Sequence, residues 1–116
     1  MNCTLELPYP PSANRYWRNF RGRTVISAEA QAYRDVVNIL ARRQYQGNPT
    51  ESPVAVSMII RRPARRRDLD NHFKVMLDAL QNIIYVNDGQ IFRLNAEMID
   101  DKKRPGVTVT VSEIEE

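Results

Sequence analysis

Two aspartates separated by a single residue, Asp68 and Asp70, stand near the middle of the chain, and Lys74 follows them. In an extended backbone, residues i and i+2 project to the same side, so these carboxylates would lie about 7 Å apart. Like charges at that distance repel by ~2–3 kcal/mol at an effective dielectric of 20, and a divalent cation with oxygen ligands relieves this repulsion. If a helix begins near Asn71, Lys74 lies one turn from Asp70 on the same face. These residue types favour a metal-dependent reaction on a charged substrate.

A cationic block precedes the two aspartates, because five of the seven residues 61–67 are arginine, and a third acid, Asp88, follows downstream. Arginine suits planar, bidentate contacts with phosphate. Our first interpretation is a metal-dependent enzyme that acts on nucleic acid. A plainer interpretation treats Asp70 as a helix N-cap, Asp88 as the first residue of an Asp-Gly turn, and the arginines as a solvated charge run.

The composition indicates one domain that covers residues 1–116, with 42% hydrophobic and 27% charged residues, as is usual for a soluble globular protein. Cys3 is the only cysteine, which excludes a disulfide framework and a cysteine-based metal site within one monomer. No stretch approaches the ~18 apolar residues of a membrane span, and the first residues lack a signal-peptide pattern. We therefore expect a cytoplasmic protein without a membrane partner.

The net charge of +3 hides an asymmetry between the two parts of the chain. Residues 1–67 hold twelve arginines and four acids, a balance of +8, whereas residues 68–116 have a balance of −5. Arginine outnumbers lysine fourteen to three. A basic part followed by an acidic part suits a phosphodiester track that leads to a carboxylate site.

Hydrophobic periodicity predicts an α+β fold in which a mixed β-sheet carries two α-helices on one face, in the order β-β-β-α-β-α-β-β. The expected strands are 3–7, 14–20, 23–26, 54–60, 91–99 and 107–111, and the expected helices are 28–45 and about 71–84. The first helix has Ser27 as its N-cap. Its expected buried face consists of Ala30, Tyr33, Val36, Val37 and Leu40.

Strands 14–20 and 23–26 are expected to form a hairpin with a turn at Arg21-Gly22. It combines arginines with aromatic residues and has two equally supported interpretations. In one, the arginines hold phosphates while the aromatic residues stack on unpaired bases. In the other, the aromatic residues belong to the core and the arginines face solvent.

The position of Asp88 is the main geometric difficulty. A straight helix of ~14 residues after Asp70 would be about 20 Å long and would keep the two carboxylates apart. They meet only if the helix is shorter and the chain folds back, or if a partner subunit supplies Asp88. The residues alone do not decide between these arrangements.

Several motifs in order along the chain resemble the RusA-type Holliday junction resolvases. The first part matches at Pro8-Tyr9-Pro10-Pro11-Ser12 with Asn14-Arg15-Tyr16, at Ser27-Ala28-Glu29 and at Tyr33-Arg34-Asp35. The second part matches at Arg66-Arg67-Asp68-Leu69-Asp70-Asn71 with Lys74, and at Asp88-Gly89-Gln90-Ile91. Many relatives are expected to have an acid where this chain has Asn87, so an auxiliary acidic role there is in doubt.

The resemblance implies a homodimeric, Mg²⁺-dependent endodeoxyribonuclease, with Mn²⁺ as a substitute, that resolves four-way DNA junctions by paired symmetric cuts in recombination and repair. It places the metal-binding acids at Asp68, Asp70 and Asp88 and the catalytic lysine at Lys74. Mg²⁺ prefers such oxygen ligands, and a water that it activates would attack phosphorus in line. We expect DNA to be bound by Asn14, Arg15, Arg65, Arg66 and Arg67. Such genes often belong to prophages.

Two other classes of function compete with this interpretation. One is a non-catalytic protein that binds branched or single-stranded DNA through its arginines, and its binding would not depend on metal. The other is a small structural or regulatory phage protein, which would have no affinity for junctions. Incubation with synthetic four-way junctions in Mg²⁺ or EDTA separates all three.

Overall fold

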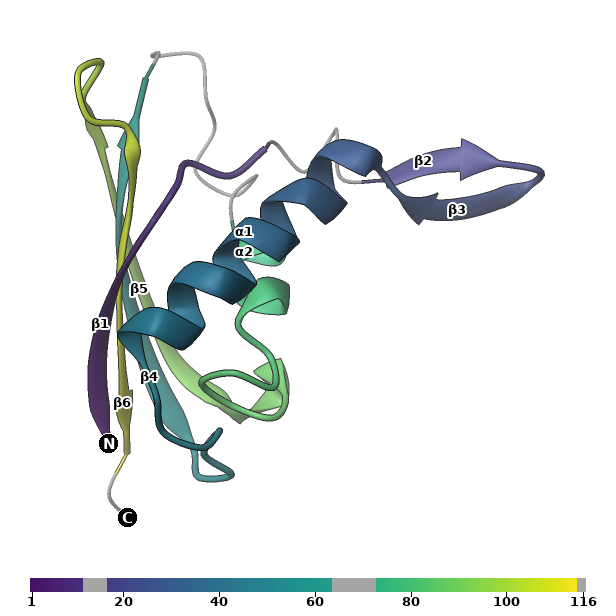
Figure 1. The fold of residues 1–116 in the computed structure, drawn as a ribbon. Helices are drawn as coiled ribbons and strands as arrows, with labels where there is room; N and C mark the ends of the chain where they lie inside the picture. Colours follow the sequence, from purple (N-terminus) through teal and green to yellow (C-terminus); the bar gives the residue numbers. More distant parts are fainter. Residues whose placement is uncertain (12–16, 64–72, 115–116) are drawn as a thin grey trace.

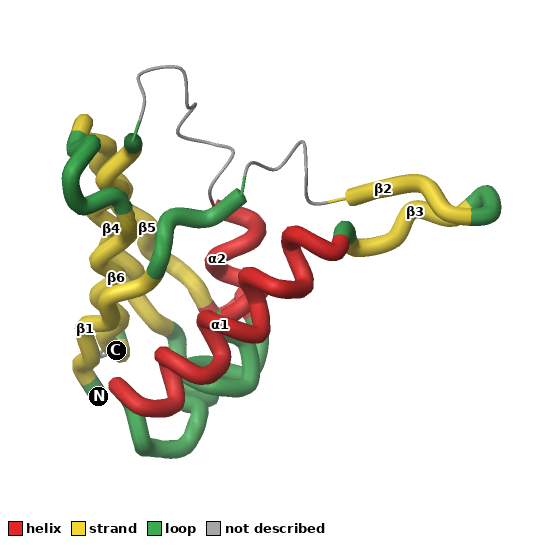
Figure 2. The backbone as a smooth tube through the Cα atoms, turned by 45° about the horizontal axis from the view of Figure 1, so that its top comes forward, coloured by secondary structure: helices red, strands yellow, loops and turns green. Residues whose placement is uncertain are grey.

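The structure is a computed structural model that describes residues 1–11, 17–63 and 73–114. It contains a four-stranded sheet and two helices that lie on the same face of this sheet (Figure 1). A separate two-stranded hairpin extends away from this body in both views (Figure 2). The predicted α+β class and the predicted order of elements are confirmed. No helix among the described residues is long and apolar enough to span a membrane.

The sheet has the order β1-β6-β4-β5 and is mixed. Strand β6 (Gly106–Glu113) lies between β1 (Asn2–Leu7) and β4 (Val54–Arg62) and is antiparallel to both. Strand β5 (Ile91–Asp100) is parallel to β4 and forms the far edge. The sheet therefore begins with the first strand of the chain and holds the last strand in its interior.

Alternation along the strands divides the sheet into a buried face and an open face. On β4, Val56, Met58 and Ile60 point toward the helices, and on β6 Val109 and Val111 do so in register with them. The intervening residues face solvent and are mostly polar. The core is completed by Leu5, Leu7, Val54, Val107 and apolar residues of the helices and of the segment that follows the second helix.

Helix α1 (Ala28–Gln44) begins and ends close to the predicted positions. The hydroxyl of Ser27 accepts a hydrogen bond from the Ala30 amide at 3.1 Å, which satisfies one of the unpaired donors of the first turn. The phenol of Tyr33 donates to the Pro8 carbonyl at 3.0 Å and joins the helix to the segment after β1. The buried face is rotated from the prediction, because Ala41 is buried while Val36 is 46% exposed.

Helix α2 (Phe73–Ala79) is much shorter than the predicted helix to residue 84, so that prediction was wrong. After Ala79 the backbone forms tighter turns, in which the amide of Ile83 donates to the carbonyl of Leu80. Asn82 adopts a left-handed conformation with φ of 66°, which asparagine tolerates better than most residues. Ile83 and Ile84 are buried even so. Their helical spacing thus reflects burial in a compact turn.

The hairpin consists of β2 (Trp17–Phe20) and β3 (Arg23–Ile26) with the predicted turn between them. Arg21 and Gly22 both have positive φ, 52° and 77°, as a two-residue type I′ turn requires. Residues 14–16 of the predicted first strand lie outside the described residues. The two interpretations of the aromatic side chains also concern atoms that the structure does not describe.

The neighbouring valines of α1 give a matched test of this packing. Val37 is fully buried, whereas Val36 is 46% exposed. Val37→Ala should lower the free energy of unfolding by about 2 kcal/mol, through lost burial and a cavity. Val36→Ala should change it by less than about 0.5 kcal/mol. Urea unfolding of both variants measures the difference, and equal losses would contradict this packing of α1.

Candidate active site

The structure describes only part of the predicted site. Asp68, Asp70, Asn14, Arg15 and the block Arg65, Arg66, Arg67 lie outside the described residues. The backbone of Lys74 belongs to the first turn of α2, and its side chain is not described. Asp88 is the one predicted site residue whose surroundings are defined. The site is therefore built here from Asp88 outward.

Asp88 opens a single 3₁₀ turn, η3 (Asp88–Gln90), that is fixed by the residues on either side of it. The side-chain oxygen of Asn87 accepts a hydrogen bond from the Gly89 amide at 2.7 Å. The side-chain oxygen of Gln90 accepts in return from the amide of Asn87, which completes a capping box. A carboxylate oxygen could accept the same hydrogen bond from the Gly89 amide. Either asparagine or aspartate at residue 87 would therefore serve as the cap.

The side chain of Gln90 also ties this turn to the segment before β4. Its oxygen accepts from the Val86 amide at 2.9 Å, while its nitrogen donates to the carbonyls of Thr50 and Ser52 at 2.8 and 2.9 Å. Backbone bonds between Thr50 and both Ile84 and Val86 strengthen the same junction. The turn that carries Asp88 is thus held against the body of the protein from two directions.

The carboxylate of Asp88 takes no part in this framework. Its backbone amide donates to the side-chain oxygen of Gln81 at 3.1 Å, and its backbone carbonyl accepts from the Ile91 amide. The residue is exposed, and its carboxylate makes no hydrogen bond or ion pair with any other described residue. The plainer interpretation of Asp88 as a turn residue is therefore incomplete, because Asn87 and Gln90 make the side-chain contacts that stabilise the turn.

The early end of α2 brings Asp88 back toward that helix. The phenol of Tyr85 donates to the Leu77 carbonyl at 2.7 Å, and Gln81, just beyond the helix, reaches the Asp88 amide. Helix α2 is only about 10 Å long, half the length that separated Asp70 from Asp88 in the straight-helix prediction. The short helix and the returning chain are observed, whereas Asp70 lies outside the described residues.

The charges of two acids, Asp88 and Asp78, act on the buried phenol of Tyr85. Burial raises the pKa of the Tyr85 phenol, and the negative charges of Asp88 and Asp78 raise it further. The phenol therefore remains a neutral hydrogen-bond donor, and both carboxylates lie close enough to act on it. Asp78 was not among the predicted site residues. Its position one turn after Lys74 on α2 was the available signal.

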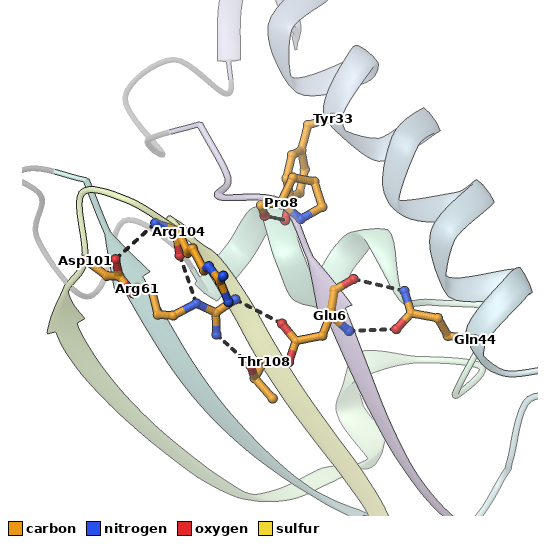
Figure 3. A network of polar contacts seen from close by, with 8 residues as sticks. All are labelled: Glu6, Pro8, Tyr33, Gln44, Arg61, Asp101, Arg104 and Thr108. Carbon is orange, nitrogen blue, oxygen red and sulfur yellow. Dashed lines mark hydrogen bonds and ion pairs between the residues drawn. The ribbon is translucent and has the colours of Figure 1, made fainter.

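The cationic block divides into two parts at the end of β4. Arg61 binds Glu6 at 2.9 Å and donates to the hydroxyl of Thr108 and the carbonyl of Arg104 (Figure 3). Arg62 pairs with Asp100 on the neighbouring strand. These two arginines thus stabilise the sheet and are partly neutralised, whereas Arg65, Arg66 and Arg67 lie outside the described residues.

The donor chemistry of Asp88 fits a hard divalent cation, because it offers carboxylate oxygens that no described residue occupies. Within the described parts of the chain, no three acidic, histidine or cysteine side chains gather closely enough to hold a metal ion. A hollow of about 440 Å³ lies elsewhere, on the open face of β4 and β5, and Ser57, Asn95 and Glu97 are among its lining residues. It is lined by neither Asp88 nor Asp78, so we place the candidate site at Asp88.

Comparison with known proteins identifies the family of this chain. The family model described as endodeoxyribonuclease RusA matches residues 8–112. A crossover junction endodeoxyribonuclease RusA from Shigella sonnei is 37% identical over 96% of this chain and 94% of its own length. Relatives of the same name from Escherichia coli K12 and Enterobacteria phage 82 are 36% and 38% identical, over 96% and 95% of this chain and 94% and 93% of their own. The chain belongs to the RusA family of endodeoxyribonucleases.

Proposed function

We propose that this protein is a Mg²⁺-dependent, structure-selective endodeoxyribonuclease that resolves four-way DNA junctions by paired symmetric cuts. The names of its relatives support the junction as substrate, since they are crossover junction endodeoxyribonucleases. The relative from Enterobacteria phage 82 supports a prophage origin. In this proposal the protein acts as a homodimer in the cytoplasm, in DNA recombination and repair.

The observation that carries the proposal is the state of Asp88. Its turn is fixed by the Asn87 cap and the Gln90 side chain, while its exposed carboxylate has no partner among the described residues. A binding or catalytic site needs side chains that are held in a fixed geometry relative to the ligand. The rigid turn holds the exposed Asp88 in such a fixed position. An acid that only improved solubility would not need it.

Each proposed site residue has a separate role. Asp68, Asp70 and Asp88 would hold Mg²⁺, which when bound supplies charge neutralisation and activation of water at the scissile phosphate. Lys74, in the first turn of α2, would place its ammonium group near that phosphate and offset negative charge as the bond breaks. Asn14, Arg15 and Arg65 to Arg67 would contact the DNA backbone and fix its position without reading sequence.

The primary test compares a synthetic four-way junction with linear duplex of the same sequence, each with Mg²⁺ or EDTA. Paired cuts in the junction alone, and only with Mg²⁺, are the expected result. Binding without any cutting in Mg²⁺ would instead identify a non-catalytic binding protein. Mn²⁺ should substitute for Mg²⁺, because its ligand preferences are similar.

Asp88→Asn should reduce junction cleavage by at least about a hundredfold, the scale for loss of one group that stabilises charge in a transition state. Junction binding should be unchanged or tighter, because one negative charge near the phosphate is lost. Asp70→Asn should behave in the same way. Single-turnover cleavage and electrophoretic binding assays separate the two effects.

Asp101→Asn is the matched control for Asp88→Asn. Asp101 follows the opposite end of β5, a ten-residue strand that spans roughly 33 Å. Its side-chain oxygen caps a turn by accepting from the amides of Lys103 and Arg104, which asparagine can also do. Normal cleavage is expected. Similar losses in both variants would remove Asp88 from the metal site.

Replacement of Arg65, Arg66 and Arg67 by alanine should weaken binding to every DNA and flatten its dependence on salt. Each lost phosphate contact should reduce the slope of log K against log salt by about 0.9. The control replaces Arg34, Arg42 and Arg43 of α1, which removes the same charge from a helix. Equal slopes for the two triple variants would indicate that Arg65, Arg66 and Arg67 are a solvated charge run without phosphate contacts.

The paired cuts require two copies of the site, because one chain supplies a single acidic cluster and a junction has two-fold related strands. In a heterodimer of the unchanged chain and Asp70→Asn, we expect one nick per bound junction and few resolved duplexes. Denaturing and native gels of the same reaction distinguish nicked from resolved products. Paired cuts by a protein that light scattering shows to be monomeric would defeat this proposal.

A further inference from the structure

Strand β5 forms an edge of the sheet that the fold leaves open. It pairs only with β4 among the described strands, and most of its ten residues are exposed. Phe92 is 67% exposed and Leu94 is 42% exposed, although Leu94 is in register with the buried Val56 and so points to the face that carries the helices. A long, exposed and apolar edge strand is a template for another strand.

The hydrogen-bonding groups on this edge can be assigned from the register. The Asp101 amide donates to the Arg62 carbonyl, in step with the pairing of Arg62 with Asp100 in the parallel ladder. Since bonding alternates along a strand, odd-numbered residues of β5 bond to β4 and even-numbered residues direct their backbone groups outward. The register shifts between Ile91 and Arg93, so this alternation applies from Arg93 onward, where Leu94, Ala96 and Met98 are outward residues. In the described part of the chain, nothing bonds to their outward amides or carbonyls.

The opposite edge of the sheet is treated differently. On β1, the outward amide and carbonyl of Glu6 are both bonded by the side-chain amide of Gln44, at 2.7 and 2.9 Å (Figure 3). Three prolines, Pro8, Pro10 and Pro11, follow this strand and prevent its extension as a ladder. Gln44 of α1 therefore blocks strand pairing on the β1 edge at Glu6. Nothing in the described part of the chain blocks the β5 edge in this way.

The sequence of β5 is complementary to itself in one antiparallel register. With Asn95 opposite Asn95 of a second copy, Arg93 lies opposite Glu97. Leu94 then faces Ala96. The even-numbered pairs are the ones whose backbone groups point outward, so they become the hydrogen-bonded pairs. Apolar pairs lie on the helix face and charged pairs on the open face, as each face requires.

Other antiparallel registers that keep all helices on one face do not place Arg93 opposite Glu97. A shift by one pair places Arg93 opposite either Ile99 or Asn95, and Glu97 no longer faces a cation. Arg93 and Glu97 form no ion pair with another described residue, so both charges are available to a partner. Opposite charges directly across an antiparallel pair are stabilising, and like charges are destabilising.

We propose that β5 pairs with β5 of a second copy about a two-fold axis at Asn95, which joins the two sheets into one with all helices on the same face. The inference rests on the homodimer proposed above and names its surface. Leu94 of each copy is covered by Ala96 of the other. The contact is isologous, as two-fold symmetry demands.

Cysteine cross-linking tests the axis directly. Directly opposed residues in a non-hydrogen-bonded antiparallel pair have Cα atoms about 4.5 Å apart, within the range of a disulfide. In a Cys3→Ala background, Asn95→Cys should therefore form a covalent dimer under mild oxidation. Asn2→Cys, at an exposed position on the closed β1 edge, is the control and should stay monomeric on a non-reducing gel.

Charge reversal tests the register. Arg93→Glu and Glu97→Arg each place like charges across both symmetric pairs, and either should raise the dimer dissociation constant at least about tenfold. The two changes combined restore opposite charges and should restore dimerisation. Analytical ultracentrifugation measures all three, and circular dichroism confirms that these exposed changes leave the fold intact.

The outcomes separate this surface from the dimer itself. A dimer that neither cross-links at residue 95 nor responds to charge reversal would overturn the β5 pairing and leave the homodimer in place. A protein that remains monomeric at micromolar concentration and on junction DNA would overturn both. Cross-linking together with charge-swap rescue supports the proposed interface.

Discussion

A single side-chain amide, that of Gln90, holds together the region on which the candidate site depends. Its oxygen and nitrogen bond four backbone groups from two separate segments, residues 50–52 and 86–87. These segments lead into the two parallel strands β4 and β5. One amide therefore sets where the parallel pair begins and fixes the turn that exposes Asp88. A carboxylate in place of this amide would lose both donated bonds, so the position has a narrow chemical requirement.

Ion pairs at the end of β4 also stabilise the sheet. Arg61 and Arg62 lie within the strand and pair with Glu6 and Asp100, so part of the arginine run serves the sheet. The guanidinium group of Arg61 reaches across β6 to Glu6 on β1, and that of Arg62 reaches Asp100 on the adjacent β5. The sequence shows five arginines close together and offers no sign of this division. The division depends on the fold, which brings Glu6 of β1 and Asp100 of β5 next to Arg61 and Arg62.

Sequence reasoning succeeded where local signals and packing agree. Alternation identified every strand of the main sheet, and Ser27 marked the start of α1. It failed at the second helix, because the apolar spacing of Leu80, Ile83 and Ile84 fits a helix and a buried turn equally well. It also missed the capping box at Asn87 and Gln90, although the spacing of cap and partner was present in the sequence. Asp78 was not among the predicted site residues, because its effect on the Tyr85 phenol depends on the chain reversal.

The place of β6 between β1 and β4 has a consequence for how the protein is made. Strand β1 has no neighbour in the sheet except β6, and their contacts join residues as far apart as Thr4 and Thr110. While the chain emerges from the ribosome, the first strand must wait for nearly all later residues before it can pair. The long loops that this closure requires slow folding relative to a protein of local contacts. The nascent chain can form α1 and the β2–β3 hairpin early, but the four-stranded sheet is assembled only after β6 has been synthesised.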